Sequence, residues 1–109
     1  RQNCSMCHGL LAGGDGPVGD RLNDYTGVRP PAFDSDRVST LSEGQLFVSL
    51  AKGQGRMPAF RGLLSVEDRW DLVAFVQMDA AKRTQALEQV NAKPENVRTL
   101  RLLSLRSLR

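Results

Sequence analysis

The stretch CSMCHG, residues 4–9, constrains this chain more than any other, because it holds both of its cysteines and its one histidine. Cys4 and Cys7 lie one helical turn apart, and His8 lies four residues after Cys4. On a helix this spacing puts the three side chains on one face. Two thiols and an imidazole placed in this way can form a disulfide, part of a zinc site or the attachment point of a larger group.

The simpler explanations of the cysteine pair fit the sequence poorly. A Cys4–Cys7 disulfide would close a very short loop and stabilise little. A thioredoxin-like redox site needs a βαβ context, which the pattern lacks. A structural zinc site needs four ligands, and the chain has no Cys or His beyond Cys4, Cys7 and His8. The remaining interpretation is C-x-x-C-H, the attachment motif of haem c, in which each thiol bonds one vinyl group and the imidazole ligates the iron.

The rest of the chain has the apolar periodicity of helices. Thr40 and Glu43 are predicted to form a capping box, after which Leu46, Phe47 and Leu50 recur at spacings of three and four. No stretch alternates between apolar and polar residues as a strand does. The fold class predicted from this pattern is all-α.

A further helix is predicted to begin after Ser65, which can cap its first turn. Its apolar residues keep the helical period: Val66, Trp70, Leu72, Val73, Ala74, Phe75 and Val76. Residues 80–93 could extend this helix until Pro94 breaks it.

Residues 12–34 are expected to be loop-rich, because they hold five glycines and three prolines. They include GDGPVG, residues 14–19, which matches the pattern G-x-G-x-x-G. A dinucleotide site is not expected there, because no strand precedes the pattern and Pro17 interrupts it. The glycines are expected to allow a sharp turn or a close approach of the backbone.

A haem iron held by His8 needs a second axial ligand, for which the candidates are methionines. Met6 lies between the cysteines and cannot reach the opposite face. Met78 ends an apolar helical pattern, where methionine usually fills the core. Met57 precedes Pro58, which favours extended backbone at Met57 and lets its side chain project. Met57 is therefore the predicted sixth ligand, and the alternative is that it packs in the loop.

Charge divides the chain unevenly. Residues 1–78 hold eight basic and nine acidic residues, a formal charge of −1, whereas residues 79–109 hold seven and three, a charge of +4. We predict one helical domain over residues 1–79 and a polar, basic extension over residues 80–109 that is disordered in part. The extension has no aromatic residue, so nucleic-acid binding is not expected.

Together these motifs resemble the class I c-type cytochromes, which are small mono-haem electron carriers. The resemblance runs from Cys4 to Met78 and follows the order of the family's motifs. It is similar to bacterial cytochrome domains that serve respiratory complexes, such as the mono-haem subunit of alternative complex III. The segments that carry it are CSMCHG, GGDGPVG, RPPAF, SEGQLF, KGQGRMPAF and VEDRWDLVAFVQ.

The resemblance implies a small helical domain around one covalently bound haem c, with the carbonyl of Pro30 or Pro31 accepting a hydrogen bond from His8. It also implies an N-terminal helix, which this sequence does not contain, so we expect the protein to extend upstream and Leu72, Phe75 or Val76 to be exposed here. Candidate donors to the haem propionates are Arg37, Arg56 and Trp70.

The function implied is electron transfer by Fe(III)/Fe(II) cycling with His8 and Met57 as axial ligands, and not enzymatic catalysis. The expected partners are a redox donor and acceptor, with association with a membrane-bound respiratory complex. The expected location is the periplasm or the periplasmic face of the membrane, since haem is attached to such motifs outside the bacterial cytoplasm. The alternatives are a haem enzyme or gas-sensing module with an open sixth position, and a zinc or interaction module without haem.

Because the haem would supply much of the core, we predict that the double variant Cys4→Ala/Cys7→Ala is largely unfolded. Far-ultraviolet circular dichroism of the purified variant should show a large loss of helical signal relative to the wild type. Full native helicity in the variant would contradict the predicted coupling between haem attachment and folding.

Overall fold

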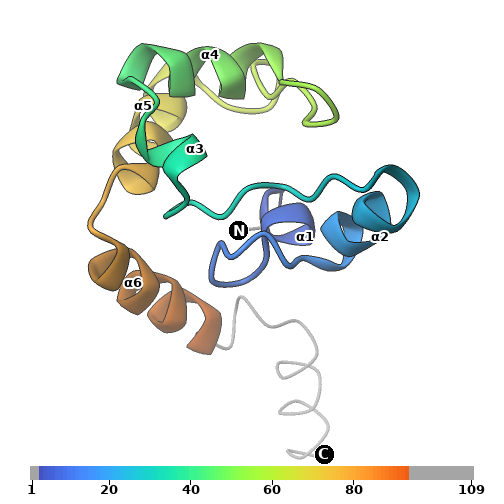
Figure 1. Cartoon of the computed structure of the whole chain (residues 1–109). Coiled ribbons are helices and arrows are strands. Elements are labelled where there is room, and N and C mark those ends of the chain that lie inside the picture. Colours follow the sequence, from blue (N-terminus) through green and yellow to red (C-terminus); the bar gives the residue numbers. More distant parts are fainter. Residues whose placement is uncertain (1–2, 94–109) are drawn as a thin grey trace, which may run out of the picture.

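The regular elements of this protein are helices, as the computed structural model of residues 3–93 shows (Figure 1). Within that range the only pairing of the β type is an isolated bridge between Gln54 and Met57. The all-α prediction is therefore confirmed. The helices are α1 Ser5–His8, α2 Pro17–Thr26, α3 Asp36–Ser39, α4 Glu43–Lys52, α5 Val66–Val76 and α6 Ala80–Ala92.

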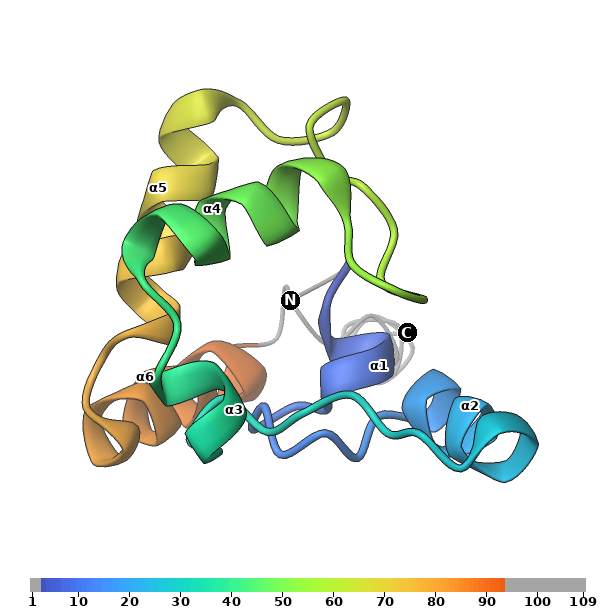
Figure 2. The same ribbon diagram turned by 45° about the horizontal axis from the view of Figure 1, so that its top comes forward.

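The helices form two packed pairs, α1 with α2 and α4 with α5. A long extended segment and the short helix α3 connect the pairs, and α6 follows α5 (Figure 1). In Figures 1 and 2 the loop between α4 and α5 reaches out above α1 and α2. The loop that carries Met57 and the turn that carries His8 therefore belong to different halves of the fold.

The hydrophobic core lies between α4 and α5. Its most buried member is Val73, with 2% of its surface exposed, and Phe47 of α4 stacks on Trp70 of α5 with ring centroids 4.2 Å apart. Helix α1 adds nothing to this core, because none of its residues is buried. The core cluster consists of Val38, Leu46, Leu50 and Val73, with Leu41, Phe47, Met57, Leu72 and Val76 packed against it.

The start of α4 corrects the predicted capping box. Its N-cap is Ser42, whose hydroxyl accepts from the Gln45 amide at 3.2 Å, and the Gln45 side chain accepts from the Ser42 amide at 2.8 Å. Thr40 is not the N-cap of α4. It is the C-cap of α3, and its hydroxyl donates to the Asp36 carbonyl at 2.8 Å. The box is therefore formed two residues later than predicted.

Helix α2 corrects the expectation that residues 12–34 are mainly loop. Pro17 opens α2 at a position where its missing N–H costs nothing, and Gly27 ends it in the left-handed conformation. The helix is polar overall, although its few apolar residues lie on one side, so the glycines and prolines around it dominate the sequence pattern. Its packing against α1 supplies the stability that the sequence pattern does not indicate.

Residues 80–93 do not extend α5. That helix ends at Val76, and α6 begins at Ala80 with the Asp79 carboxylate accepting from the Ala81 and Lys82 amides. Asn91 of α6 donates to the Leu10 carbonyl at 3.0 Å, so α6 contacts the N-terminal half of the domain. The boundary at residue 79 stays a prediction, and Pro94 and the rest of the predicted tail lie outside the described residues.

The residues expected to form an exposed apolar patch are half-buried here. Leu72 and Val76 pack against the core cluster, and Phe75 is of intermediate exposure. Within residues 3–93, no helix has the length and apolar character that crossing a bilayer requires.

We predict that Leu46→Ala lowers the free energy of unfolding by about 2–5 kcal/mol, because it leaves a cavity in the α4–α5 core. Val48→Ala on the same helix is the control: Val48 is 50% exposed, so its change should stay within about 0.5 kcal/mol. Chemical denaturation of both variants measures the difference. Equal stabilities would mean that α4 does not pack on α5 through Leu46.

Candidate functional site

Helix α1 presents the two thiols and the imidazole from a single turn. Cys4 is its N-cap, and the Cys4 carbonyl accepts from the amides of Cys7 at 3.2 Å and His8 at 2.8 Å. Both cysteines are free thiols of intermediate exposure, so no disulfide joins them. The helical turn therefore has the arrangement that the spacing of CSMCH predicted.

The ring of His8 is held by the segment that follows α2. Its Nδ1 lies 3.3 Å from the Pro31 carbonyl oxygen, and its ring centroid lies 5.1 Å from that of Phe33. A carbonyl can only accept, so Nδ1 carries the hydrogen and Nε2 keeps its lone pair in the neutral ring. The bond thereby fixes both the tautomer and the direction of the imidazole.

The environment of His8 favours the uncharged ring. Burial lowers the pKa of His8 below its usual value, and the hydrogen bond to Pro31 opposes this effect without cancelling it. A metal ligand must be neutral imidazole, because the protonated ring has no lone pair to offer. His8 is therefore in the form that can bind a metal at neutral pH.

The two candidate prolines have different surroundings. Pro31 provides the carbonyl near His8, whereas the Pro30 carbonyl lies close to the backbone of Gly14: a Cβ there would be 2.3 Å from the oxygen. Gly14 also has a φ of +80°, which favours glycine. Pro30 thus packs the returning segment onto the glycine loop, and Pro31 provides the oxygen for the imidazole.

The glycines of GDGPVG let the start of α2 approach α1 closely. The Gly16 amide donates to the Cys7 carbonyl at 3.1 Å, and a Cβ on Gly19 would lie only 2.4 Å from the same carbonyl. The segment that looked like a dinucleotide motif is therefore a support for the Cys–His turn. No strand precedes it within the described residues, in keeping with the rejection of a nucleotide site.

Met57 lies in the loop between α4 and α5. Its backbone pairs with Gln54, with N···O distances of 2.9 and 3.0 Å, and a Cβ on Gly53 would meet the Met57 carbonyl at 2.4 Å. The Met57 side chain is half-buried and packs against the α4–α5 core. The described contacts of His8 are with Pro31 and Phe33, so the structure does not bring the two predicted axial ligands into contact.

The other two methionines are placed differently. Met6 projects from α1 with 49% of its surface exposed, and Met78 is 36% exposed in the turn between α5 and α6. The Met78 carbonyl accepts from Arg83 at 2.9 Å. Met57 is the methionine that combines partial burial with a position in a loop.

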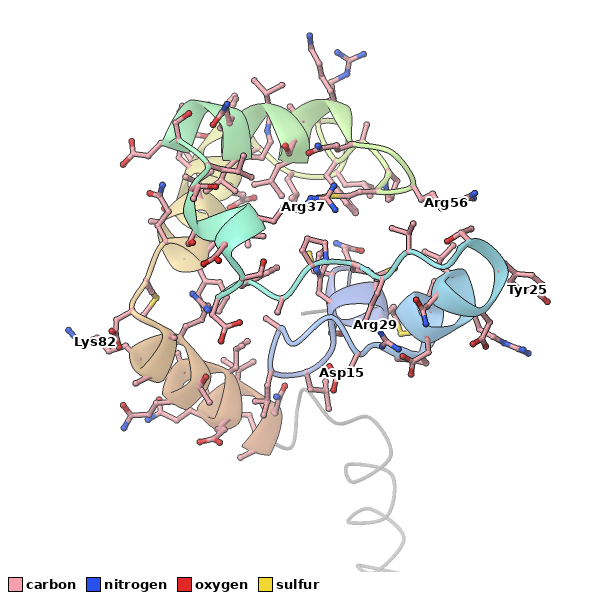
Figure 3. The ribbon with its side chains drawn as sticks, in the orientation of Figure 1. Asp15, Tyr25, Arg29, Arg37, Arg56 and Lys82 are labelled. Atoms are coloured by element: carbon pink, nitrogen blue, oxygen red, sulfur yellow. The ribbon has the colours of Figure 1, made fainter. Side chains whose placement is uncertain are left out.

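The candidate propionate donors are spread over the second half of the fold. Arg37 of α3 and Arg56 of the α4–α5 loop are exposed, and in the view of Figure 3 they lie between α4 above and the α1–α2 pair below. Trp70 stacks on Phe47 through the face of its ring, which leaves its indole N–H available as a donor.

Sequence reasoning missed two residues beside the site, Phe33 and Arg83. Phe33 packs on His8, and the Arg83 Cζ lies 5.8 Å from the centroid of the Phe33 ring. Phe33 stands two residues after Pro31 in RPPAF, so its position next to the returning segment was a usable signal. Arg83 belongs to a polar helical stretch whose pattern does not indicate burial.

The donor set fits haem c and does not fit a structural zinc ion. Two free thiols and a neutral imidazole with an unprotonated Nε2 lie on one turn, and a half-buried thioether lies in the loop of the opposite half. In the part of the chain that the structure describes, no group of three or more His, Cys, Asp or Glu side chains is placed to hold a metal ion.

We predict that Gly19→Ala lowers the free energy of unfolding by about 1–3 kcal/mol, because the new methyl group would push α2 away from the Cys7 carbonyl. Gly44→Ala is the matched control, since Gly44 also lies in a helix but faces open space. That variant should be more stable by up to about 1 kcal/mol. Denaturation curves that rank the two variants in the opposite order would contradict the close approach of α2 to α1.

Comparison with known proteins adds a family to this geometry. Residues 1–76 match the family model described as cytochrome c oxidase, cbb3-type, subunit III. No curated protein and no solved structure matches the chain. The match covers well over half of the 109 residues and includes the Cys–His turn, the glycine loop and Met57. The chain therefore belongs to this family of c-type cytochrome domains, whose activity is haem-based electron transfer.

Proposed function

We propose that this chain is a mono-haem electron-transfer domain in which Cys4 and Cys7 hold haem c through thioether bonds and His8 and Met57 ligate the iron. When bound, the haem supplies one-electron Fe(III)/Fe(II) chemistry. The observation that carries the proposal is the environment of His8. Its ring is neutral, its Nδ1 is engaged by Pro31 at 3.3 Å, and its free Nε2 shares one turn with two unpaired thiols.

The residues around His8 would act as its support during electron transfer. The Pro31 carbonyl holds the imidazole in one orientation, so the ligand does not have to reorganise between oxidation states. Phe33 covers one side of the ring and reduces its contact with water. The close backbone of Gly16 keeps the turn itself in place.

Met57 is the proposed sixth ligand. Its thioether is soft and neutral, which favours ferrous iron and raises the reduction potential. The pairing with Gln54 and the following Pro58 define the conformation of its backbone, so the side chain starts from a fixed point. Its side chain packs against the α4–α5 core, so the thioether belongs to the half of the fold that does not carry His8.

A second candidate function leaves Met57 uncoordinated. A haem held by His8 alone would have an open sixth position and could bind a gas or a peroxide. The domain would then be a haem enzyme or a gas-sensing module. The electron carrier is the better-supported function, because it is the activity of the family to which the chain belongs.

The partners and the location are also part of this proposal. A redox donor and a redox acceptor are required by any electron carrier, and the family's description as an oxidase subunit supports association with a membrane-bound respiratory complex. The resemblance to the mono-haem subunit of alternative complex III suggests a second complex of this kind. A periplasmic location, or one on the periplasmic face of the membrane, follows from where haem c is attached.

The presence of the haem is tested first, on protein made in a host competent for cytochrome c maturation. A pyridine haemochrome spectrum should report one haem c per chain, and the intact mass should exceed that of the polypeptide by one covalently bound haem. Colourless protein with the bare polypeptide mass would overturn the proposal.

The sixth ligand is tested with carbon monoxide. We predict that the reduced wild-type protein binds carbon monoxide slowly or not at all, and that Met57→Ala binds it rapidly, because the substitution removes the competing thioether. Met78→Ala is the control and should behave as the wild type, since Met78 lies in the α5–α6 turn. Rapid, complete binding to the wild-type protein would favour the open sixth position.

A further inference from the structure

Arg83 is the buried charged residue of the described chain. Only 5% of its surface is exposed, and its guanidinium carries a positive charge. Within residues 3–93 no ion pair neutralises it, although Asp34 lines the same open pocket beside Phe33. A cation kept inside a protein without an acidic partner is costly, so its position calls for a physical reason.

The end of α5 provides one part of that reason. The Arg83 Nη1 donates to the Val76 and Met78 carbonyls, each at 2.9 Å. The Val76 carbonyl ends α5, where a helix leaves its carbonyls without backbone amides and its dipole is negative, and the Met78 carbonyl lies in the turn that follows. Two hydrogen bonds stabilise the cation and join α6 to α5, but they leave its net charge in place.

The second contact of Arg83 leads to the site. Its Cζ lies 5.8 Å from the centroid of the Phe33 ring, and that ring lies 5.1 Å from the His8 ring at an angle of 54°. The two distances limit the separation between the guanidinium carbon and the centre of the imidazole to about 11 Å. Phe33 lies in contact with both groups, and an aromatic ring screens a charge much less than water does.

We propose that Arg83 is a positioning residue that holds Phe33 against His8 and raises the reduction potential of the site. This inference rests on the proposed function, that is, on haem bound by His8. Oxidation adds one positive charge to the site, and a buried cation nearby disfavours that charge. If the limit of about 11 Å to the imidazole is taken as the scale of the separation, a unit charge changes such an equilibrium by about tenfold at an effective dielectric constant of about 20.

The experiment is redox potentiometry of the haem-loaded Arg83→Gln variant, with Lys82→Gln as the matched control. Both substitutions remove one positive charge from α6, but Lys82 is exposed and points outward (Figure 3). At a fixed ambient potential, Arg83→Gln should lower the ratio of reduced to oxidised protein by about three- to tenfold, whereas Lys82→Gln should change it less than about twofold. Arg83→Lys, which keeps the charge, should restore most of the wild-type ratio.

A second variant covers the case in which Arg83→Gln does not fold. Phe33→Leu keeps the cation but removes the aromatic ring that contacts both Arg83 and His8. The ratio of reduced to oxidised protein should therefore fall in this variant as well. In the Phe33→Leu background, Arg83→Gln should have a smaller effect than in the wild type, because the two residues act through one contact. Thermal unfolding of every variant is recorded beside the potential.

The result that would overturn the proposal is a wild-type ratio in Arg83→Gln or, if that variant does not fold, in Phe33→Leu. A purely structural Arg83 would lower the unfolding temperature of its variants and leave the ratio unchanged. Each sample is first assayed for haem by pyridine haemochrome. Absence of haem in the wild type would refute the proposed function itself, whereas a haem-loaded protein with unchanged potentials refutes the part assigned to Arg83 alone.

Discussion

The hydrogen bond between the His8 ring and the Pro31 carbonyl is the interaction around which the N-terminal half of the domain is organised. It joins residues 23 positions apart at 3.3 Å, and the glycine loop and α2 lie between them in the sequence. Gly14 and Gly19 make this possible because a side chain at either position would strike the neighbouring backbone. The turn that carries the thiols is thus held from outside, since four helical residues cannot hold themselves.

The second half of the fold is stabilised by an apolar core. Helices α4 and α5 bury a small apolar cluster around Val73, and the Met57 loop rests on that cluster. The two helix pairs contact each other little, and Arg83 of α6 is one of the residues that link them, through Phe33 on one side and the end of α5 on the other. The contacts of Arg83 are therefore among those that hold the two halves of the domain together.

Several of these features could be predicted from the sequence. The C-x-x-C-H motif predicted that Cys4, Cys7 and His8 share one helical turn. The apolar spacing predicted the helices now seen as α4 and α5, and Ser65 accepts from the Asp68 amide as its residue type suggests. The capping box was predicted two residues too early because both Thr40 and Ser42 are residue types that can serve as an N-cap. In the structure Thr40 ends α3, which leaves Ser42 as the N-cap of α4.

The sequence by itself determined the all-α class and the grouping of Cys4, Cys7 and His8, because each depends on residues a few positions apart. It also determined the family, because the order of the motifs along residues 1–76 can be read without a structure. Only the tertiary structure decided that α2 forms in a glycine-rich stretch, that Pro31 and not Pro30 meets the imidazole, and that Arg83 is buried. The physical reason is the same in each case. These features depend on close contacts between segments distant in the chain, and such contacts have no local signature in the residues that make them.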